Sequence, residues 1–355
     1  MPGQLSLNSG GVIMGPYLAA PSADGACVLV ECEGTMPVAV EFGVTESYGN
    51  YAETESVEAT GAGTYVHNLR MQGLPAGTSC HYRVTRGAAV SGDYVFKTAK
   101  LPGAAFRMAW ASDFQKNTKK HAQISKKILE AGPDFCLYGG DIATFGTYDS
   151  IKSEFFTPEE LALLSVTPFF FTVGNHEGWG TASRAFYQAP ETASGRQDCY
   201  SFDYGDMHVL VLNAEDRMDP SSGQYTFASA DLAASAAKWK LISVHHPYYS
   251  GNGPDYVPFD SAGLARIIED IAVPQGVDMV LSGHIHNYQH NLINGIHHMI
   301  IATAGGDLDL AAPVGGYTLN SVSSYCYGIF DADSVSLTLN VYNENGFKID
   351  GFFLH

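Results

Sequence analysis

The alternation of apolar and polar positions divides the chain near residue 100. Between about residues 15 and 98, short runs with alternating apolar residues are separated by turn-forming residues, a pattern typical of β-strands. These strand-like runs cover residues 26–32, 38–42, 64–70, 80–85 and 93–97. Their regular spacing predicts a small β-sandwich in this part of the chain.

Beyond Gly103 the pattern changes, because apolar runs now alternate with helical stretches. Residues 121–130 carry apolar side chains at helical spacing and stop near Gly132, and residues 259–272 contain a second such stretch. Residues 200–212 predict a β-hairpin. This alternation is typical of α/β units with parallel strands, to which the hairpin adds antiparallel ones.

Composition and charge exclude some classes of partner. The net charge is -18 with only 19 Lys and Arg residues, which argues against nucleic acid as the main partner. We expect no membrane span, because no apolar run reaches the roughly 18 residues that a spanning helix needs. The first ten residues lack the basic and apolar regions of a signal peptide. The cysteines are widely spaced, and Cys136 is expected in the core. The sequence does not fix the oligomeric state.

Residue types that bind metals follow five apolar runs in the second part of the chain. A single Asp after a strand more often caps a helix, and Gly-Asn alone predicts a turn. Five such motifs in sequence, each after an apolar run, predict a shared site, since the carboxyl ends of parallel strands meet at one edge of a sheet. Carboxylate, amide and imidazole ligands suit hard or borderline divalent metals. The series is Asp113, Asp141, Asn175 with His176, His245, and His284 with His286.

The first part of the chain has no comparable series. Its His67 and His81 occur singly within strand-like runs. We expect both histidines to have structural roles.

The motifs in the second part resemble those of calcineurin-like metallophosphoesterases. They read Gly-Asp, Gly-Asn-His-Glu, His-x-Pro-x-Tyr and Gly-His-x-His in this order, after the leading Asp113. The preceding sandwich, with Gly-Pro-Tyr-Leu at residues 15–18, resembles the N-terminal fibronectin type III-like domain of the purple acid phosphatase branch. The resemblance implies a four-layer α/β/β/α sandwich in residues 101–355, preceded by a small all-β sandwich in residues 1–100.

The resemblance also implies a centre of two divalent metal ions that acts on a small-molecule phosphate ester. By this likeness Asp141 bridges the metals, and His176 assists the leaving group while a metal-activated hydroxide attacks. The other implied ligands are Asn175, His245 and His284 for one metal, and Asp113 and His286 for the other. Asn175, His176 and Tyr249 are expected to contact the substrate. The activity implied is that of a phosphomonoesterase, and the location implied is secreted or periplasmic.

Two positions depart from the family pattern. Purple acid phosphatases bind ferric iron through a tyrosine three residues after the Gly-Asp aspartate, where this chain has Thr144. Relatives outside that branch commonly have His where this chain has Gln115, whose amide oxygen could bind the first metal directly or through water. This ligand set disfavours Fe(III) and leaves Mn, Fe(II), Zn and Mg open. We therefore expect a colourless protein with a weaker first metal position and no Fe(III)-tyrosinate.

Two alternative functions remain open from the sequence. A phosphodiesterase or nucleotide hydrolase would use the same core with a wider pocket. A binding protein with a degenerate metal site would fit the changes at Gln115 and Thr144, but it would not be expected to keep the other ligands intact. Loops at residues 177–197 and 250–260 would determine the substrate, and their shape cannot be predicted.

Overall fold

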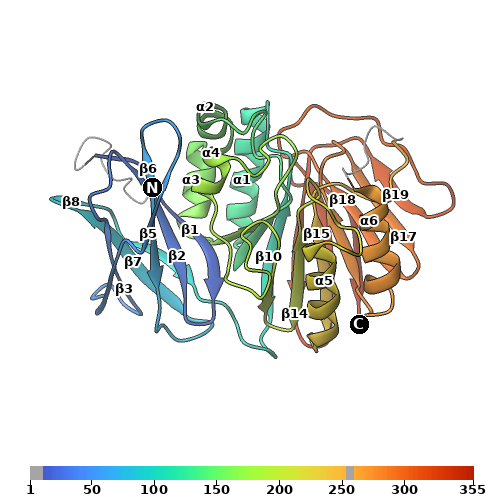
Figure 1. The fold of residues 1–355 in the computed structure, drawn as a ribbon, viewed down its shortest axis with the longest axis horizontal. Helices are drawn as coiled ribbons and strands as arrows, with labels where there is room; N and C mark the ends of the chain where they lie inside the picture. The colour runs from blue at the N-terminus through green and yellow to red at the C-terminus, as the bar shows by residue number, and fades with distance from the viewer. Residues whose placement is uncertain (1–10, 253–259) are drawn as a thin grey trace.

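The computed structural model describes residues 11–252 and 260–355, and its first part is a β-sandwich (Figure 1). All five predicted strands are confirmed, and four further strands join them. One sheet has the order β4-β3-β7-β8, with β9 also on β7, and it faces β1, β2, β6 and β5. The strands are β1 (Val12–Ser22), β2 (Gly25–Cys32), β3 (Ala39–Gly43), β4 (Asn50–Glu53), β5 (Ser56–Ala59), β6 (Tyr65–Met71), β7 (Ser79–Arg86), β8 (Ala89–Val90) and β9 (Tyr94–Lys97).

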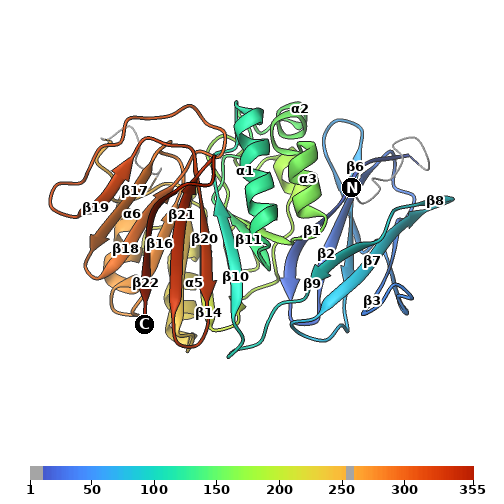
Figure 2. The same ribbon diagram turned by 180° about the vertical axis from the view of Figure 1, so that it is seen from behind.

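The second part is the predicted four-layer α/β/β/α sandwich, in which two sheets face each other between helices (Figures 1 and 2). The first sheet contains β10 (Phe106–Ala111), β11 (Phe135–Tyr138), β12 (Phe169–Phe171), β20 (Cys326–Ala332), β21 (Leu337–Asn343) and β22 (Lys348–Leu354). The second sheet contains β13 (Tyr200–Tyr204), β14 (Met207–Leu212), β15 (Trp239–Val244), β16 (Met279–Ser282), β17 (Tyr288–Ile293), β18 (Ile296–Ile301) and β19 (Thr318–Val322). The pair β13–β14 is the predicted hairpin.

Helices cover the outer faces of both sheets. The helix predicted over 121–130 is α1, which Asn117 caps by accepting a hydrogen bond from the Lys120 amide and which Gly132 ends in a left-handed conformation. The stretch predicted over 259–272 forms α6 and η3, with Phe259 outside the described residues. The helices are α1 (Thr118–Ala131), α2 (Tyr148–Ser150), η1 (Ile151–Phe155), α3 (Pro158–Leu164), α4 (Thr181–Phe186), α5 (Gly223–Ala234), α6 (Ser261–Arg266) and η3 (Ile267–Ala272), of which η1 and η3 are π-helical.

Strand β1 joins the two parts into one sheet. It pairs antiparallel with β2 and parallel with β12, where Ala19 lies opposite Phe169. The resulting ten-stranded sheet runs in the order β22-β21-β20-β10-β11-β12-β1-β2-β6-β5. Tyr17 of β1 is fully buried in the core of the second part, and its hydroxyl donates to the Phe186 carbonyl at 3.1 Å. The boundary near residue 100 stays a prediction, because the sheet is continuous across it.

The cysteines and the helices bear on two of the sequence expectations. All six cysteines are buried and free, and Cys136 lies in the core on β11 as expected. Within residues 11–252 and 260–355, no helix combines the length and the apolar character that crossing a membrane requires.

A buried carboxylate further ties the sandwich to the second part. Glu31 on β2 is 0% exposed and accepts hydrogen bonds from Thr64 Oγ1 at 2.7 Å, Tyr148 Oη at 2.6 Å and Lys152 Nζ at 2.5 Å. Tyr148 and Lys152 belong to α2 and η1 of the second part. A buried charge is stable only when it is paired and hydrogen-bonded, so Glu31 fixes how the two parts meet.

We predict that Glu31→Ala destabilises the protein, because it leaves Lys152 partly buried without its carboxylate. The free energy of unfolding should fall by about 3 kcal/mol, the lower end of the range for breaking a buried ion pair. Urea denaturation measures this change. The control is Glu58→Ala, at an exposed position on β5, which should change the value by about 0.5 kcal/mol or less. Equal effects of the two substitutions would contradict the role of Glu31.

Candidate metal centre

Five strands bring the predicted ligands to neighbouring edges of the two sheets. Strands β10, β11 and β12 are parallel in the first sheet, and β15 and β16 are parallel in the second. Each strand ends just before one of the predicted motifs. The side chains that the structure brings into one cluster are Asp113, Gln115, Asp141, Asn175, His176, His245, His284 and His286.

In one half of the cluster, atoms with lone pairs point at one another. His245 Nδ1 lies 2.7 Å from the Gly139 carbonyl, so it carries the proton and leaves a lone pair on Nε2 of the neutral ring. That Nε2 faces Asn175 Oδ1 at 3.1 Å and Asp141 Oδ2 at 3.2 Å. Asn175 Oδ1 is also 2.9 Å from His284 Nδ1. His245 Nε2 thus faces two oxygens with its lone pair, and a cation among these atoms or an extra proton on the ring would stabilise them.

The other half repeats this arrangement with different ligands. His286 Nδ1 lies 2.7 Å from the Asp307 carbonyl, and its Nε2 faces Asp113 Oδ1 at 3.4 Å. Asp113, Asp141 and His286 offer ligand atoms that all lie within 4.8 Å of one another. This trio matches the ligands predicted for the first metal.

Gln115 lies at the edge of this trio. Its Nε2 is 3.1 Å from His286 Nε2 and 3.4 Å from Asp141 Oδ2. Its Oε1 is buried and has no hydrogen-bond partner within the described part of the chain. A buried amide oxygen without a partner costs free energy unless an ion or water satisfies it. The amide nitrogen, a donor, is the atom that faces the trio, so Gln115 would present its oxygen to a metal with the amide turned over. Asp113, Asp141 and His286 by themselves fit a divalent metal at this position.

The pKa values in the cluster reflect the same crowding of acceptors. Burial alone would lower the pKa of His245, but the adjacent Asp141 carboxylate outweighs burial and raises this pKa to about 10. Burial alone would raise the pKa of Asp141, but His245 and His176 lower it. The proton on His245 thus occupies the place where a cation would satisfy the same atoms.

His176 differs from the other members because it is open to solvent. Its backbone amide donates to Asp141 Oδ1 at 2.9 Å, and its Nδ1 lies 2.8 Å from the Thr144 carbonyl. Nε2 is therefore free at the surface of the cluster, 3.8 Å from Asp141 Oδ2, with 35% of the side chain exposed. The ring of Tyr249 packs against Tyr248 and His298, and its expected contact with the substrate stays a prediction.

The backbone at the cluster adopts conformations that side chains rarely take. Asp113, Asp141 and His284 have φ values of 60°, 54° and 70°, in the left-handed region. Neighbouring glycines permit this crowding. A Cβ on Gly174 would lie 2.2 Å from Asp141 Oδ1, and one on Gly283 would lie 2.5 Å from Asp113 Oδ2.

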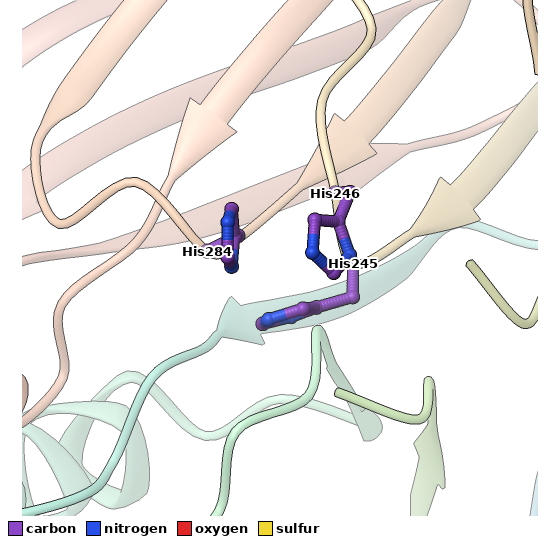
Figure 3. Close-up of side chains that lie close together, drawn as sticks. All are labelled: His245, His246 and His284. Carbon is purple, nitrogen blue, oxygen red and sulfur yellow. The ribbon is translucent and has the colours of Figure 1, made fainter. Parts of the chain in front are cut away.

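Two residues that contact the cluster, Glu177 and His246, lie outside the ligand set predicted from the sequence. Glu177 is buried beneath it and accepts from the Asp141 and Gly174 amides at 3.1 and 2.9 Å. Figure 3 shows that His246 stands beside His245 and His284. The positions of Glu177 and His246 directly after predicted ligands were the only available signals.

The sandwich also contains a group of residues that sequence analysis did not predict. Glu46, His81 and Asp93 lie close enough to hold a metal, and His81 Nδ1 is 2.8 Å from Asp93 Oδ2. His67 is buried, and its two ring nitrogens lie 3.1 Å from Thr54 Oγ1 and 3.1 Å from the Gly34 carbonyl. These hydrogen bonds support a structural role for His67.

Comparison with known proteins identifies the family. Residues 106–288, slightly more than half of the chain, match the calcineurin-like phosphoesterases. The chain belongs to the calcineurin-like phosphoesterase family. Among curated relatives, purple acid phosphatase 22 of Arabidopsis thaliana is 27% identical over 240 residues, which cover 63% of this chain and 53% of that protein. The chain thus spans about half the length of the curated relatives that it matches.

Solved structures support the same calcineurin-like fold for the whole chain. The purple acid phosphatase PPD1 from yellow lupin (Lupinus luteus) seeds superimposes with a TM-score of 0.81 at 19% identity, covering 95% of this chain and 73% of that one. A structure of PhoD gives a TM-score of 0.70 at 15% identity, covering 96% of this chain and 91% of that one. The N-terminal sandwich is therefore part of the shared fold.

We predict that Gly174→Ala disrupts the cluster, because the added methyl group would overlap Asp141. The free energy of unfolding should fall by about 1–3 kcal/mol, as is typical of overpacking, and less divalent metal should bind. Thermal melts and metal analysis measure both effects. The control is Gly223→Ala at the start of α5, where nothing lies within 4 Å of the new Cβ. Normal metal binding by Gly174→Ala would contradict the prediction.

Proposed function

We propose that this protein is a metal-dependent hydrolase of small-molecule phosphate esters, with phosphomonoesters as preferred substrates. The observation that carries the proposal is the convergence of lone pairs from five strand ends in one cluster. Membership of the calcineurin-like phosphoesterase family supports it, as does the similarity to proteins named purple acid phosphatases. We also infer from this similarity that the protein acts outside the cytoplasm.

The cluster offers two metal positions that share Asp141. Asn175, His245 and His284 would hold one metal, while Asp113 and His286 would hold the other with help from Gln115. Two divalent ions in such a centre would lower the pKa of water and neutralise the charge on phosphoryl oxygens. The protein thus supplies the ligand geometry, and the bound ions supply the electrophilic chemistry.

His176 would deliver a proton to the leaving oxygen as the imidazolium, which carries a second proton on Nε2 and becomes the neutral ring on giving it up. The Thr144 carbonyl fixes its Nδ1 proton and leaves Nε2 at the open side of the cluster. An alkoxide leaving group needs a proton, so a general acid at this point lowers the barrier. A carboxylic acid would serve less well, because its ionised form would repel the anionic substrate.

Phosphate charge would be met mainly by the metals in this arrangement. Arg196 follows Arg184 in the chain as the second arginine after the Gly-Asn-His-Glu motif. It is paired with Asp198 and Asp216 at 2.7 Å each. Lys116 is paired with Asp307 at 2.8 Å at the surface. Both cations are already neutralised, which agrees with a centre that depends on metal ions for binding.

We predict that His176→Ala lowers kcat more for substrates whose leaving group is more basic and so needs a proton. For an alkyl phosphate the loss should be about 10²- to 10⁴-fold, the usual contribution of a general acid. For 4-nitrophenyl phosphate, whose phenolate leaves without a proton, the loss should be much smaller. Steady-state assays of wild type and variant on both monoesters, with the matching diester as a third substrate, measure these effects.

The control for this assay is His81→Ala, which removes a histidine of the sandwich distant in sequence from the cluster. Its kcat should equal that of the wild type on every substrate. Wild-type protein stripped by a chelator should be inactive and should recover with added divalent metal. An equal loss on alkyl and aryl esters would contradict the acid role of His176, and turnover by the stripped protein would contradict the proposed function.

We predict that iron-loaded protein shows no intense visible charge-transfer band. Thr144 occupies the position of the colour-giving tyrosine, and its hydroxyl donates to Glu154 Oε2 at 2.7 Å. No phenolate is available there to bind Fe(III). An absorption spectrum after reconstitution with iron measures this directly, with iron content determined on the same sample. A strong visible band at full iron occupancy would contradict the prediction.

A further inference from the structure

His246 is a buried histidine that the proposed ligand set does not use. It follows His245 directly at the end of β15 and is 5% exposed. Its ring centroid lies 3.9 Å from that of His284 and 5.2 Å from that of His245 (Figure 3). A third histidine this close to two predicted ligands could itself contact a metal bound by them.

The hydrogen bonding of His246 is incomplete. Its Nδ1 is buried without a hydrogen-bond partner within residues 11–252 and 260–355, and the nearest carboxylate oxygen, Glu215 Oε1, is 3.5 Å away. A buried polar atom left without a partner is costly, so such atoms in native proteins usually serve a function. A proton on Nδ1, the ring nitrogen on the Glu215 side, would leave the lone pair of the ring on Nε2.

The same three histidines can surround one cation. His245, His246 and His284 each offer a ring nitrogen, and these atoms lie within 4.8 Å of one another. A metal-bound histidine usually donates its remaining ring N–H to a carboxylate, which fixes the tautomer and the ring orientation. Glu215 is placed to give this support to His246.

We propose that His246 is a further metal ligand, whose Nε2 joins His245 and His284 as the third imidazole of one metal position while Glu215 orients it. This proposal rests on metal binding at the proposed centre, but not on ester hydrolysis. A third imidazole makes the position selective, since imidazole suits Zn²⁺, Fe and Ni²⁺, while Mg²⁺ and Mn²⁺ prefer oxygen ligands. The metal position formed by His245, His246 and His284 should therefore prefer Zn²⁺ to Mg²⁺ and Mn²⁺.

The test compares metal affinities of the whole chain after removal of bound metal. Zn²⁺ and Mn²⁺ are titrated separately against a chelator of known affinity, for wild type, His246→Phe, His246→Gln and Glu215→Gln. His246→Phe should weaken Zn²⁺ binding by at least about 100-fold and Glu215→Gln by about 10-fold, in line with losses seen for metal-supporting residues. Mn²⁺ affinity should change by less than about 3-fold, because oxygen ligands dominate its binding.

The matched control is His298→Phe. His298 is also 5% exposed, and its Nε2 also lacks a hydrogen-bond partner within the described residues, but it lies on β18 outside the cluster. Its Zn²⁺ affinity should equal that of the wild type. Visible spectra of the Co²⁺-loaded proteins provide a second measurement, because removing a nitrogen ligand shifts the d–d bands. His246→Gln and Glu215→Gln keep the test valid if His246→Phe does not fold.

Several results would overturn the proposal. One is unchanged Zn²⁺ affinity with an unchanged Co²⁺ spectrum in the His246 variants. Another is an equal loss of Zn²⁺ and Mn²⁺ affinity, which would remove the claim of selectivity. If the wild type binds metal but hydrolyses no ester, the proposed function fails while the role of His246 stands. If hydrolysis occurs and the His246 variants bind Zn²⁺ normally, only this proposal fails.

Discussion

The structure depends on a group of electron-rich atoms that repel one another unless positive charge lies among them. At the centre, His245 Nε2 faces Asp141 Oδ2 at 3.2 Å and Asn175 Oδ1 at 3.1 Å. Hydrogen bonding at Nδ1 turns the lone pairs of His245 and His286 inward. With a neutral ring, His245 Nε2 has no proton to offer either of these two oxygens. The fold is therefore built around a positive charge, which a proton on His245 or bound metal ions can supply.

The rest of the fold holds these atoms in place against that repulsion. Asp113, Asp141 and His284 take left-handed backbone conformations, which cost free energy for residues other than glycine. Packing around these residues offsets this cost, because the strands that precede them are buried, apart from Arg107 of β10, in a core shared by both sheets. Strand β1 and the buried Glu31 extend this rigid frame into the sandwich. The N-terminal part thus stabilises the sheet that carries half of the cluster.

The sequence predicted most of the fold and most of the cluster, for a clear physical reason. A ligand such as Asp141 is recognisable because it combines a metal-binding side chain with a place just after a buried strand. Strand β1 was not predicted, because the Gly15-Pro16 pair and small residues hide its alternation. Glu215 also gave no signal, since its approach to His246 depends on how a loop after β14 folds over β15. Tyr249 packs against His298, and its predicted contact with the substrate stays a prediction. The direction of the Tyr249 side chain depends on the path of the loop after β15 and not on residue type.

The two halves of the cluster differ in kind, and this difference bears on the chemistry. One half has two imidazoles and an amide around Asp141, with a third imidazole from His246 alongside. The other has the Asp113 carboxylate, one imidazole and the Gln115 amide, whose oxygen is still without a partner within the described residues. Nitrogen-rich and oxygen-rich ligand sets favour different metals. On the proposed assignment, the ion on the Gln115 side would be held more weakly. Asp141 would be the one ligand that both ions share. Loss of the ion on the Gln115 side would leave the imidazole half intact, so on this assignment we expect the two metals to bind stepwise.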